Sequence, residues 1–198
     1  MAPRQTQAER SESTINRILD ATVECLVELG YSRTSTLVVH ERAGISRGAL
    51  LHHFPLRAEL MAAAVDHMFE QMQATIDVTS GSQGDPVDRA VRTLWSTFTS
   101  NLGVAAQELL TAARTDPELR TALVRREADL NRRIHAMFGR VFGPELVSRP
   151  LYDTTFRLLA QAMRGAAATR ALHPDASARP DLIRWAEVAT RLLAVESL

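Results

Sequence analysis

The first segment whose residues could do chemistry is Gly-Ile-Ser-Arg-Gly at residues 44–48. It matches G-x-S-x-G, the pattern around the nucleophilic serine of many hydrolases. That serine works only where a strand precedes it and a helix follows it, because the sharp turn between them exposes its hydroxyl above a sheet. Here the residues before Gly44 have helical spacing, and no segment alternates convincingly as a strand. We therefore expect no catalytic residues and no enzyme.

The histidines and the single cysteine do not suggest a metal site either. His40-Glu41 begins the zinc pattern H-E-x-x-H, but position 44 is glycine, so the second histidine is absent. His52 and His53 are adjacent, and adjacent residues on a helix point to different faces. Cys25 is the only cysteine, which excludes an internal disulfide and a cysteine-rich zinc site. We expect no metal and no cofactor.

Arg47 is a candidate for a different chemistry, contact with a DNA base, if the helix that carries it enters the major groove. A guanidinium can donate to guanine O6 and N7 together when a helix presents it to the major groove. Residues 36–43 and 47–53 predict two short helices, with Ser35 and Ser46 as caps and Gly44 in the break between them. Two short helices joined by a glycine-containing turn form the helix-turn-helix pattern.

The elements that must position this motif are also helical. Residues 1–10 predict a flexible arm, and residues 11–29 carry apolar side chains at steps of three and four, with Ser11 or Ser13 as the N-cap. Further helices are predicted after Pro55 and over residues 87–102, 104–115, 117–142, 151–172 and 181–195. The sum is an all-α fold of about nine helices.

Residues 30–60 resemble the DNA-binding domain of the tetracycline-repressor (TetR) family of transcriptional regulators. The family pattern is roughly G-[YF]-x-x-[TS]-[TS]-x-x-x-I-A-x-x-A-G-[VI]-S-x-G-x-L-Y-x-H-F-x-x-K-x-x-L. The matching residues are Gly30, Tyr31, Thr34, Ser35, Val39, Ala43, Gly44, Ile45, Ser46, Gly48, Leu50, His53, Phe54, Arg57 and Leu60. The resemblance implies a DNA-binding domain over residues 1–57, including the arm, and a helical ligand-binding and dimerisation domain over residues 58–198.

The motif and the resemblance together assign the DNA contacts. Arg47 is the expected base reader, Gly48 lets the backbone approach the DNA, and Ala49 can meet a thymine methyl. His52, His53 and Arg57, which replaces the family's lysine, are expected at phosphates. The whole predicted set is Thr34, Ser35, Thr36, Ser46, Arg47, Gly48, Ala49, Leu51, His52, His53 and Arg57.

Two positions depart from the family pattern. His40 replaces a small alanine on the first helix of the motif, and we interpret it as a partly exposed structural residue. Leu51 replaces a tyrosine that commonly touches a phosphate in relatives. This loses one hydrogen bond but leaves an apolar contact to a thymine methyl possible.

The later helices are expected to hold a small-molecule effector and to form a dimer. The resemblance raises the hypothesis of a cavity in the helical core, which would otherwise be ordinary packing; a few polar groups would orient the ligand. The residues predicted to bind it are Met68, Met72, Trp95, Phe98, Thr99, Leu102, Gln107, Leu110, Met137 and Phe138. The last two long helices resemble the family's dimerisation elements, the first rich in small residues around Gly165.

Composition bounds the partners and the location. The chain has 198 residues with 23 basic and 23 acidic side chains, and every basic one is arginine. Residues 1–57 hold 7 arginines against 6 acids, so placed arginines rather than a bulk positive charge must meet the DNA. Residues 1–13 are polar and lack the apolar core of a signal peptide, and no stretch approaches the roughly 18 apolar residues that cross a bilayer. We expect a cytoplasmic protein without membrane contact.

The predicted function is that of a ligand-responsive transcriptional regulator. It would bind a palindromic operator in double-stranded DNA as a homodimer, since one motif reads only a few base pairs. We expect a repressor that a small-molecule effector releases from DNA, with an activator left open by the sequence. The alternative is a helical module that binds a small molecule or a protein and has lost DNA binding, with His40 and Leu51 as its marks.

Overall fold

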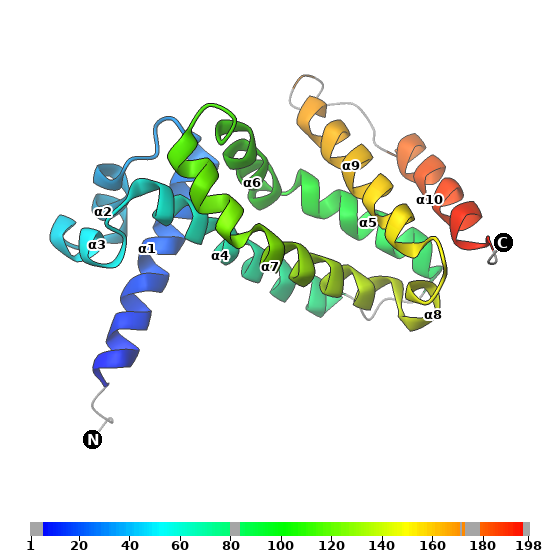
Figure 1. Cartoon of the computed structure of the whole chain (residues 1–198), viewed down its shortest axis with the longest axis horizontal. Helices are drawn as coiled ribbons and strands as arrows, with labels where there is room; N and C mark the ends of the chain where they lie inside the picture. The colour runs from blue at the N-terminus through cyan, green and yellow to red at the C-terminus, as the bar shows by residue number, and fades with distance from the viewer. Residues whose placement is uncertain (1–5, 80–83, 171, 173–178, 196–198) are drawn as a thin grey trace. The chain divides into compact units, whose positions relative to one another are not determined.

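The computed structural model describes residues 6–79, 84–170, 172 and 179–195, and these form helices and connecting turns without a strand (Figure 1). The all-α prediction is therefore confirmed. The described residues contain ten helices. They are α1 (Gln7–Leu29), α2 (Thr36–Ala43), α3 (Arg47–His53), α4 (Arg57–Thr79), α5 (Pro86–Thr99), α6 (Asn101–Ala112), α7 (Pro117–Phe142), α8 (Pro144–Val147), α9 (Tyr152–Arg170) and α10 (Arg179–Leu193). The element beyond the predicted nine is α8, a four-residue turn of helix between α7 and α9.

The first helix begins earlier than predicted. Thr6 is its N-cap, and its hydroxyl accepts from the amide of Glu9 while the Glu9 carboxylate accepts from the amide of Thr6. This reciprocal capping box satisfies two amides that a helix start leaves unpaired. The predicted N-caps Ser11 and Ser13 are therefore wrong, and residues 7–10 of the predicted arm are helical; residues 1–5 lie outside the described residues.

Contacts divide the described chain into two units. The first contains the residues up to Gln71 together with Glu108–Glu127, and the second contains Met72–Gln107 together with the residues from Ala128 onward. The helices α4, α6 and α7 each contribute residues to both units. A functional boundary at residue 57 stays a prediction.

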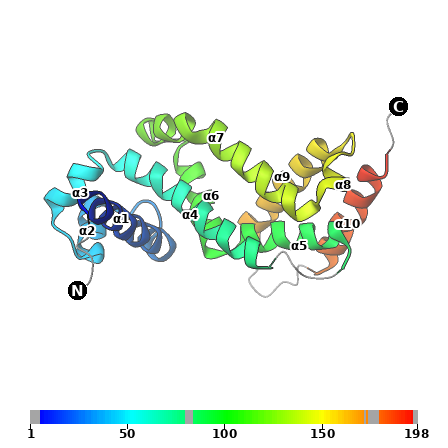
Figure 2. The same cartoon turned by 90° about the horizontal axis from the view of Figure 1, so that it is seen from below.

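In the first unit, α1 packs against α2, and α2 against α3 (Figure 2). The periodic apolar face of α1 supplies Ile18, Cys25 and Leu26, which are almost completely buried. Leu50 of α3 and Leu60 of α4 are buried as well. Burial of such side chains contributes about 1.5–3 kcal/mol each, so this core fixes the helix-turn-helix on α1.

In the second unit, α5, α9 and α10 pack against one another, with α9 and α10 running in opposite directions (Figure 1). Trp95 of α5 and Trp185 of α10 meet with ring centroids 5.5 Å apart. Phe138 of α7 and Phe156 of α9 form a second aromatic contact at 5.6 Å.

Among the described residues, no helix combines the length and the apolar character needed to cross a membrane.

Candidate nucleic-acid interface and effector pocket

Two serine caps and one glycine, all close together in the sequence, form the turn between α2 and α3. Ser35 caps α2 by accepting from the amide of Val38, and Ser46 caps α3 by accepting from the amide of Ala49. Gly44 has φ 62° and ψ 39°, a left-handed conformation that glycine adopts without steric cost. These groups end one helix and start the next within three residues, so Arg47 lies at the first position of α3.

Two arginines attach the motif to α1. Arg17 of α1 donates through Nη2 to the carbonyl of Ala43 at 2.7 Å and to that of Gly44 at 3.3 Å. Arg42 of α2 pairs with Glu28 of α1 at 2.7 Å. The Arg17 bonds satisfy carbonyls that the end of α2 leaves without helical partners. Both arginines therefore orient the two short helices.

Arg57 of α4 holds the loop that leads into α2. Its Nε donates to the carbonyl of Thr34 at 2.9 Å, and Nη2 donates to the carbonyl of Tyr31 at 2.5 Å. The guanidinium carbon also lies 4.0 Å from the centre of the Tyr31 ring. Charged donors on backbone carbonyls and a cation over an aromatic face each stabilise a fold. Arg57 thus fixes the position from which Ser35 starts α2.

Two carboxylates from distant parts of the sequence hold Tyr31 from the other side. Glu108 of α6 accepts from the Tyr31 amide at 2.5 Å, and Asp116, just before α7, accepts from the Tyr31 hydroxyl. Asp116 also accepts from the amide of Leu119 at 2.9 Å. The entrance to the helix-turn-helix is therefore fixed by α4, α6 and α7 together. We call Tyr31, Arg57, Glu108 and Asp116 the Tyr31 cluster.

The pKa values of two groups in the Tyr31 cluster are shifted. The Leu119 amide and then the Tyr31 hydroxyl lower the pKa of Asp116 below 3.8. Burial, followed by the bond to Asp116, raises the pKa of Tyr31 from 10.0 to about 12. A lowered carboxyl pKa gives stability that is present above pH 3.8 and lost below it. A raised tyrosine pKa gives stability that is complete below pH 10.0 and lost as pH rises through about 12.

We therefore predict a pH-dependent effect of Tyr31→Phe. The difference in free energy of unfolding between wild type and variant should be constant at neutral pH, because the hydroxyl bond is then intact. This difference should become smaller below pH 3.8, which is the ordinary pKa of the Asp116 carboxyl. It should also become smaller between pH 10.0 and about pH 12, where the Tyr31 hydroxyl ionises. Chemical denaturation across the pH range measures this difference, and a difference independent of pH would contradict the assignment.

The predicted DNA-contacting residues differ in exposure. Ser46, Arg47 and Gly48 are exposed, as are Leu51 and His52. The residues Ser35, Thr36, Ala49, His53 and Arg57 are half-buried. This leaves α3 with an accessible first turn.

Arg47 differs from the other arginines of this region. Arg17, Arg42 and Arg57 are occupied as described above, and Arg33 donates through Nε to the carbonyl of Leu29. Within the described part of the chain, Arg47 has no hydrogen-bond or ion-pair partner. Its guanidinium is therefore available to a base.

Thr34 and Arg57, which were predicted to contact DNA, have structural roles, as does His40, which departs from the family pattern. Thr34 is completely buried and its hydroxyl donates to the carbonyl of Gly30 at 2.8 Å, which removes it from the surface that can meet DNA. Arg57 is engaged by Tyr31 and Thr34, and a phosphate contact for it stays a prediction. His40 is half-buried with Nδ1 3.3 Å from the carbonyl of Ile45, so in its Nδ1–H tautomer it donates across the turn.

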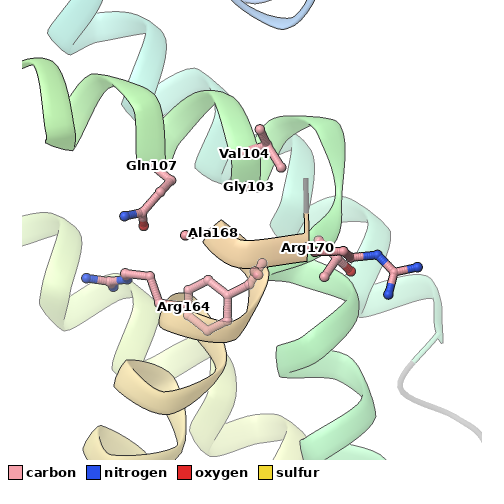
Figure 3. A pocket seen from close by; sticks show the side chains of 9 residues that line it. Gly103, Val104, Gln107, Arg164, Ala168 and Arg170 are labelled. Carbon is pink, nitrogen blue, oxygen red and sulfur yellow. The ribbon is translucent and has the colours of Figure 1, made fainter. Parts of the chain in front are cut away.

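The second unit contains a cavity of about 290 Å³. The lining comes from the end of α5, from α6 and from α9: Phe98, Thr99, Gly103, Val104, Gln107, Arg164, Ala167, Ala168 and Arg170 (Figure 3). Gly103 is required here, because a Cβ would lie 2.1 Å from the carbonyl oxygen of Thr97. The volume is at the lower end of the range for small-molecule sites, which begins at about 300 Å³.

The cavity joins three of the predicted ligand residues, Phe98, Thr99 and Gln107. Seven predicted residues do not line it: Met68, Met72, Trp95, Leu102, Leu110, Met137 and Phe138. Met68, Met137 and Phe138 are core side chains, at most 2% exposed, and Leu110 is 47% exposed. Apolar helical spacing does not separate a cavity wall from a packed core.

The small residues around Gly165 were predicted to serve dimerisation, and neither Arg164 nor Ala167 and Ala168 were predicted to line the cavity. The sequence offered one signal, a single arginine between Met163 and the small residues 165–168. Among the described residues, no group of three or more histidine, cysteine, aspartate or glutamate side chains is placed to hold a metal ion.

Comparison with known proteins bears on both regions. Residues 18–64, which include α2 and α3, match the family model described as "Bacterial regulatory proteins, tetR family". An uncharacterized HTH-type transcriptional regulator of Mycobacterium tuberculosis is 30% identical over 176 residues, covering 86% of this chain and 89% of that protein. The HTH-type transcriptional repressor KstR of Mycolicibacterium smegmatis is 33% identical over 85 residues, which are 43% of this chain and 40% of the repressor.

The fold is also similar to that of solved structures. The multidrug binding protein EbrR in complex with ethidium superposes with a TM-score of 0.66 at 23% identity. The match covers 92% of this chain and 99% of EbrR. The likeness therefore extends through the helices beyond the helix-turn-helix.

Proposed function

Since the chain belongs to the tetR family of bacterial regulatory proteins and is a DNA-binding transcriptional regulator, we propose that it is a ligand-responsive repressor. It binds a palindromic operator as a homodimer and is released by a small-molecule effector. The family consists of transcriptional regulators rather than enzymes. We place it in the cytoplasm, where the bacterial chromosome lies.

The proposal rests on Arg47, which is exposed at the first position of α3. Arg17 and Arg42 hold α2 and the turn on α1, so the first turn of α3 is presented with little freedom. Preorganised groups bind without the entropic cost of ordering themselves. Ser46, Gly48 and Ala49 surround Arg47 with small side chains, which allows α3 to approach the base edges closely.

A gel-shift titration of the full chain with genomic fragments of its source organism tests the function at low salt. We expect discrete retained fragments. Absence of any retained fragment would instead favour the module that has lost DNA binding. Since residues 1–57 are nearly neutral, retention should depend on salt less steeply than for a strongly basic domain.

The proposed dimer interface lies on faces of α9 and α10 that remain exposed. On α9, Leu158 is 57% exposed, and Ala162 and Gly165 continue the same helix face with small residues. On α10, Ile183 and Val188 are about half exposed. The apolar stripe of α10 packs within the chain instead: Ala189 and Leu193 are buried, and Leu182, Trp185 and Leu192 are half-buried. A second copy that packs on the exposed faces would form a four-helix bundle.

We predict that Leu158→Glu yields a monomer at concentrations where the wild type is a dimer, because it places a charge in an apolar contact. Sedimentation velocity measures the mass. The control is Val124→Glu on α7, where the replaced side chain is 59% exposed and lies in the other unit. If both variants remain dimeric, the interface does not involve this face of α9.

The proposed effector site is the 290 Å³ cavity. The multidrug binding protein EbrR, which has a similar fold, has been observed in complex with ethidium. In this chain, the α6 residues Gly103, Val104 and Gln107 line the cavity. Glu108, which directly follows Gln107 in the same helix, belongs to the Tyr31 cluster. A ligand that displaces α6 would therefore act on the residue that fixes the entrance to α2. Ligand and DNA affinities must then be coupled reciprocally.

A further inference from the structure

The cavity contains a charged group that lacks a counter-ion. Arg164 of α9 is half-buried, and its guanidinium carbon lies 5.6 Å from the centre of the Phe98 ring. Among the described residues it has no carboxylate partner and no hydrogen-bond acceptor. Burial lowers the pKa of Arg164, yet a guanidinium stays protonated at neutral pH. Even partial burial of a charge is costly unless a partner compensates it, so the site is suited to an incoming anion.

The other residues that line the cavity indicate which chemical group carries the anionic charge of the ligand. Phe98, Gly103, Val104, Ala167 and Ala168 are apolar, and no aspartate or glutamate lines the cavity. Figure 3 shows the Gln107 amide and the Arg164 guanidinium on one side of Ala168, with the Arg170 guanidinium directed the other way. A ligand would therefore place an acidic group at Arg164 and an apolar body against the remaining wall.

We propose that the cavity binds an amphipathic organic monoanion, which is a carboxylate attached to an aromatic or aliphatic body. This inference rests on the proposed effector function. A carboxylate can accept two parallel bonds from one guanidinium, which gives both affinity and orientation. Thr99 cannot replace Arg164 as the donor, because its hydroxyl proton is given to the carbonyl of Trp95 at 2.8 Å. One guanidinium on this side of the cavity neutralises one negative charge, so a dianion is disfavoured. Arene cations such as ethidium are disfavoured by the same charge.

The experiment titrates the full-length protein with 2-naphthoate and decanoate, each beside its neutral amide, and with ethidium. Binding is followed by tryptophan fluorescence, since Trp95 lies one turn before Thr99 and contacts Trp185. We expect each carboxylate to bind at least 10-fold more tightly than its amide. The variant Arg164→Gln should weaken carboxylate binding by about 10- to 100-fold and leave the amides unaffected, as for loss of a charged hydrogen bond.

The matched control is Arg157→Gln, which removes the same charge from an exposed position on α9 outside the cavity. It should bind the carboxylates as the wild type does. Melting temperatures of both variants separate a loss of binding from a loss of fold. Equal affinity of carboxylate and amide, or an unchanged preference in Arg164→Gln, would overturn the inference.

The same compounds are added to a gel shift with a retained genomic fragment, which separates this inference from the proposed function. Release by a carboxylate supports both. Release by an amide or by ethidium, but not by a carboxylate, keeps the effector function and overturns the anion. Failure of the wild type to retain any DNA while carboxylates still bind with the Arg164 preference overturns the repressor function and keeps the anion.

Discussion

Replacing Arg47 by alanine is expected to lower operator affinity by about 30-fold to 10⁴-fold and to relax the sequence preference. A bidentate contact between arginine and guanine discriminates by about 1–3 kcal/mol, and a homodimer makes that contact twice. Arg47 is exposed at the start of α3 and has no partner in the described part of the chain, so its removal leaves the fold intact. Gel-shift titrations with the operator and with scrambled DNA give both affinities.

The control for this prediction is Arg33→Ala. Arg33 is exposed in the same unit and donates to the Leu29 carbonyl, so its loss removes the same charge away from α3. It should change operator and scrambled affinities by a similar factor, if at all, because a phosphate contact carries no sequence information. An unchanged ratio of the two affinities in Arg47→Ala would show that another residue reads the bases.

Replacing Arg57 by alanine is expected to lower the free energy of unfolding by about 2–4 kcal/mol, because two backbone carbonyls lose a charged donor and Tyr31 loses a cation over its ring. For a chain of this size, the melting temperature should fall by roughly 5–15 °C. Arg57→Lys should be intermediate, since an ammonium keeps the charge but cannot reproduce the two-armed geometry. Thermal unfolding followed by circular dichroism measures these changes.

The matched control is Arg92→Ala. Arg92 forms an exposed ion pair with Asp88 one helical turn away, at 2.8 Å, and such pairs contribute little. Its melting temperature should stay close to that of the wild type. Equal melting temperatures for the Arg57 and Arg92 variants would mean that the Tyr31 cluster does not hold the entrance to α2.

The helix-turn-helix was predictable because its signals are local. The bounds of α2 and α3 coincide with the predicted residues 36–43 and 47–53, since serine caps and a left-handed glycine act within a few residues. The start of α1 was missed for a related reason. Thr6 and Glu9 form a capping box within a polar stretch, where the apolar periodicity used to find the helix has not yet begun.

The Tyr31 cluster was not predictable, because its contacts join residues far apart in the sequence. Glu108 and Asp116 are 77 and 85 positions from Tyr31, and no periodicity connects them. Arg57 matched the family pattern as a cation, but its direction toward Tyr31 and Thr34 depends on the tertiary fold. The same limit applies to the cavity, where Arg164 meets Phe98 from a different helix.

The structure shows how individual arginines are used in a chain whose net charge is zero. Arg17 and Arg57 donate to backbone carbonyls inside the first unit, and Arg42 forms an ion pair with Glu28. Arg47 is the proposed base reader, and Arg164 is the proposed partner of the anion. Specific binding thus depends on the placement of single guanidinium groups, and the sum of charges does not predict it.

We propose that a homodimer reads two symmetric half-sites through Arg47 of α3. Sequencing of genomic fragments retained by the full chain, performed in parallel with Arg47→Ala, tests this proposal. For the wild type we expect a two-fold symmetric motif whose half-sites are about one DNA turn apart. In the variant, the guanine positions within each half-site should lose their preference. A motif without symmetry, or the same symmetric motif with unchanged guanines in Arg47→Ala, would contradict it.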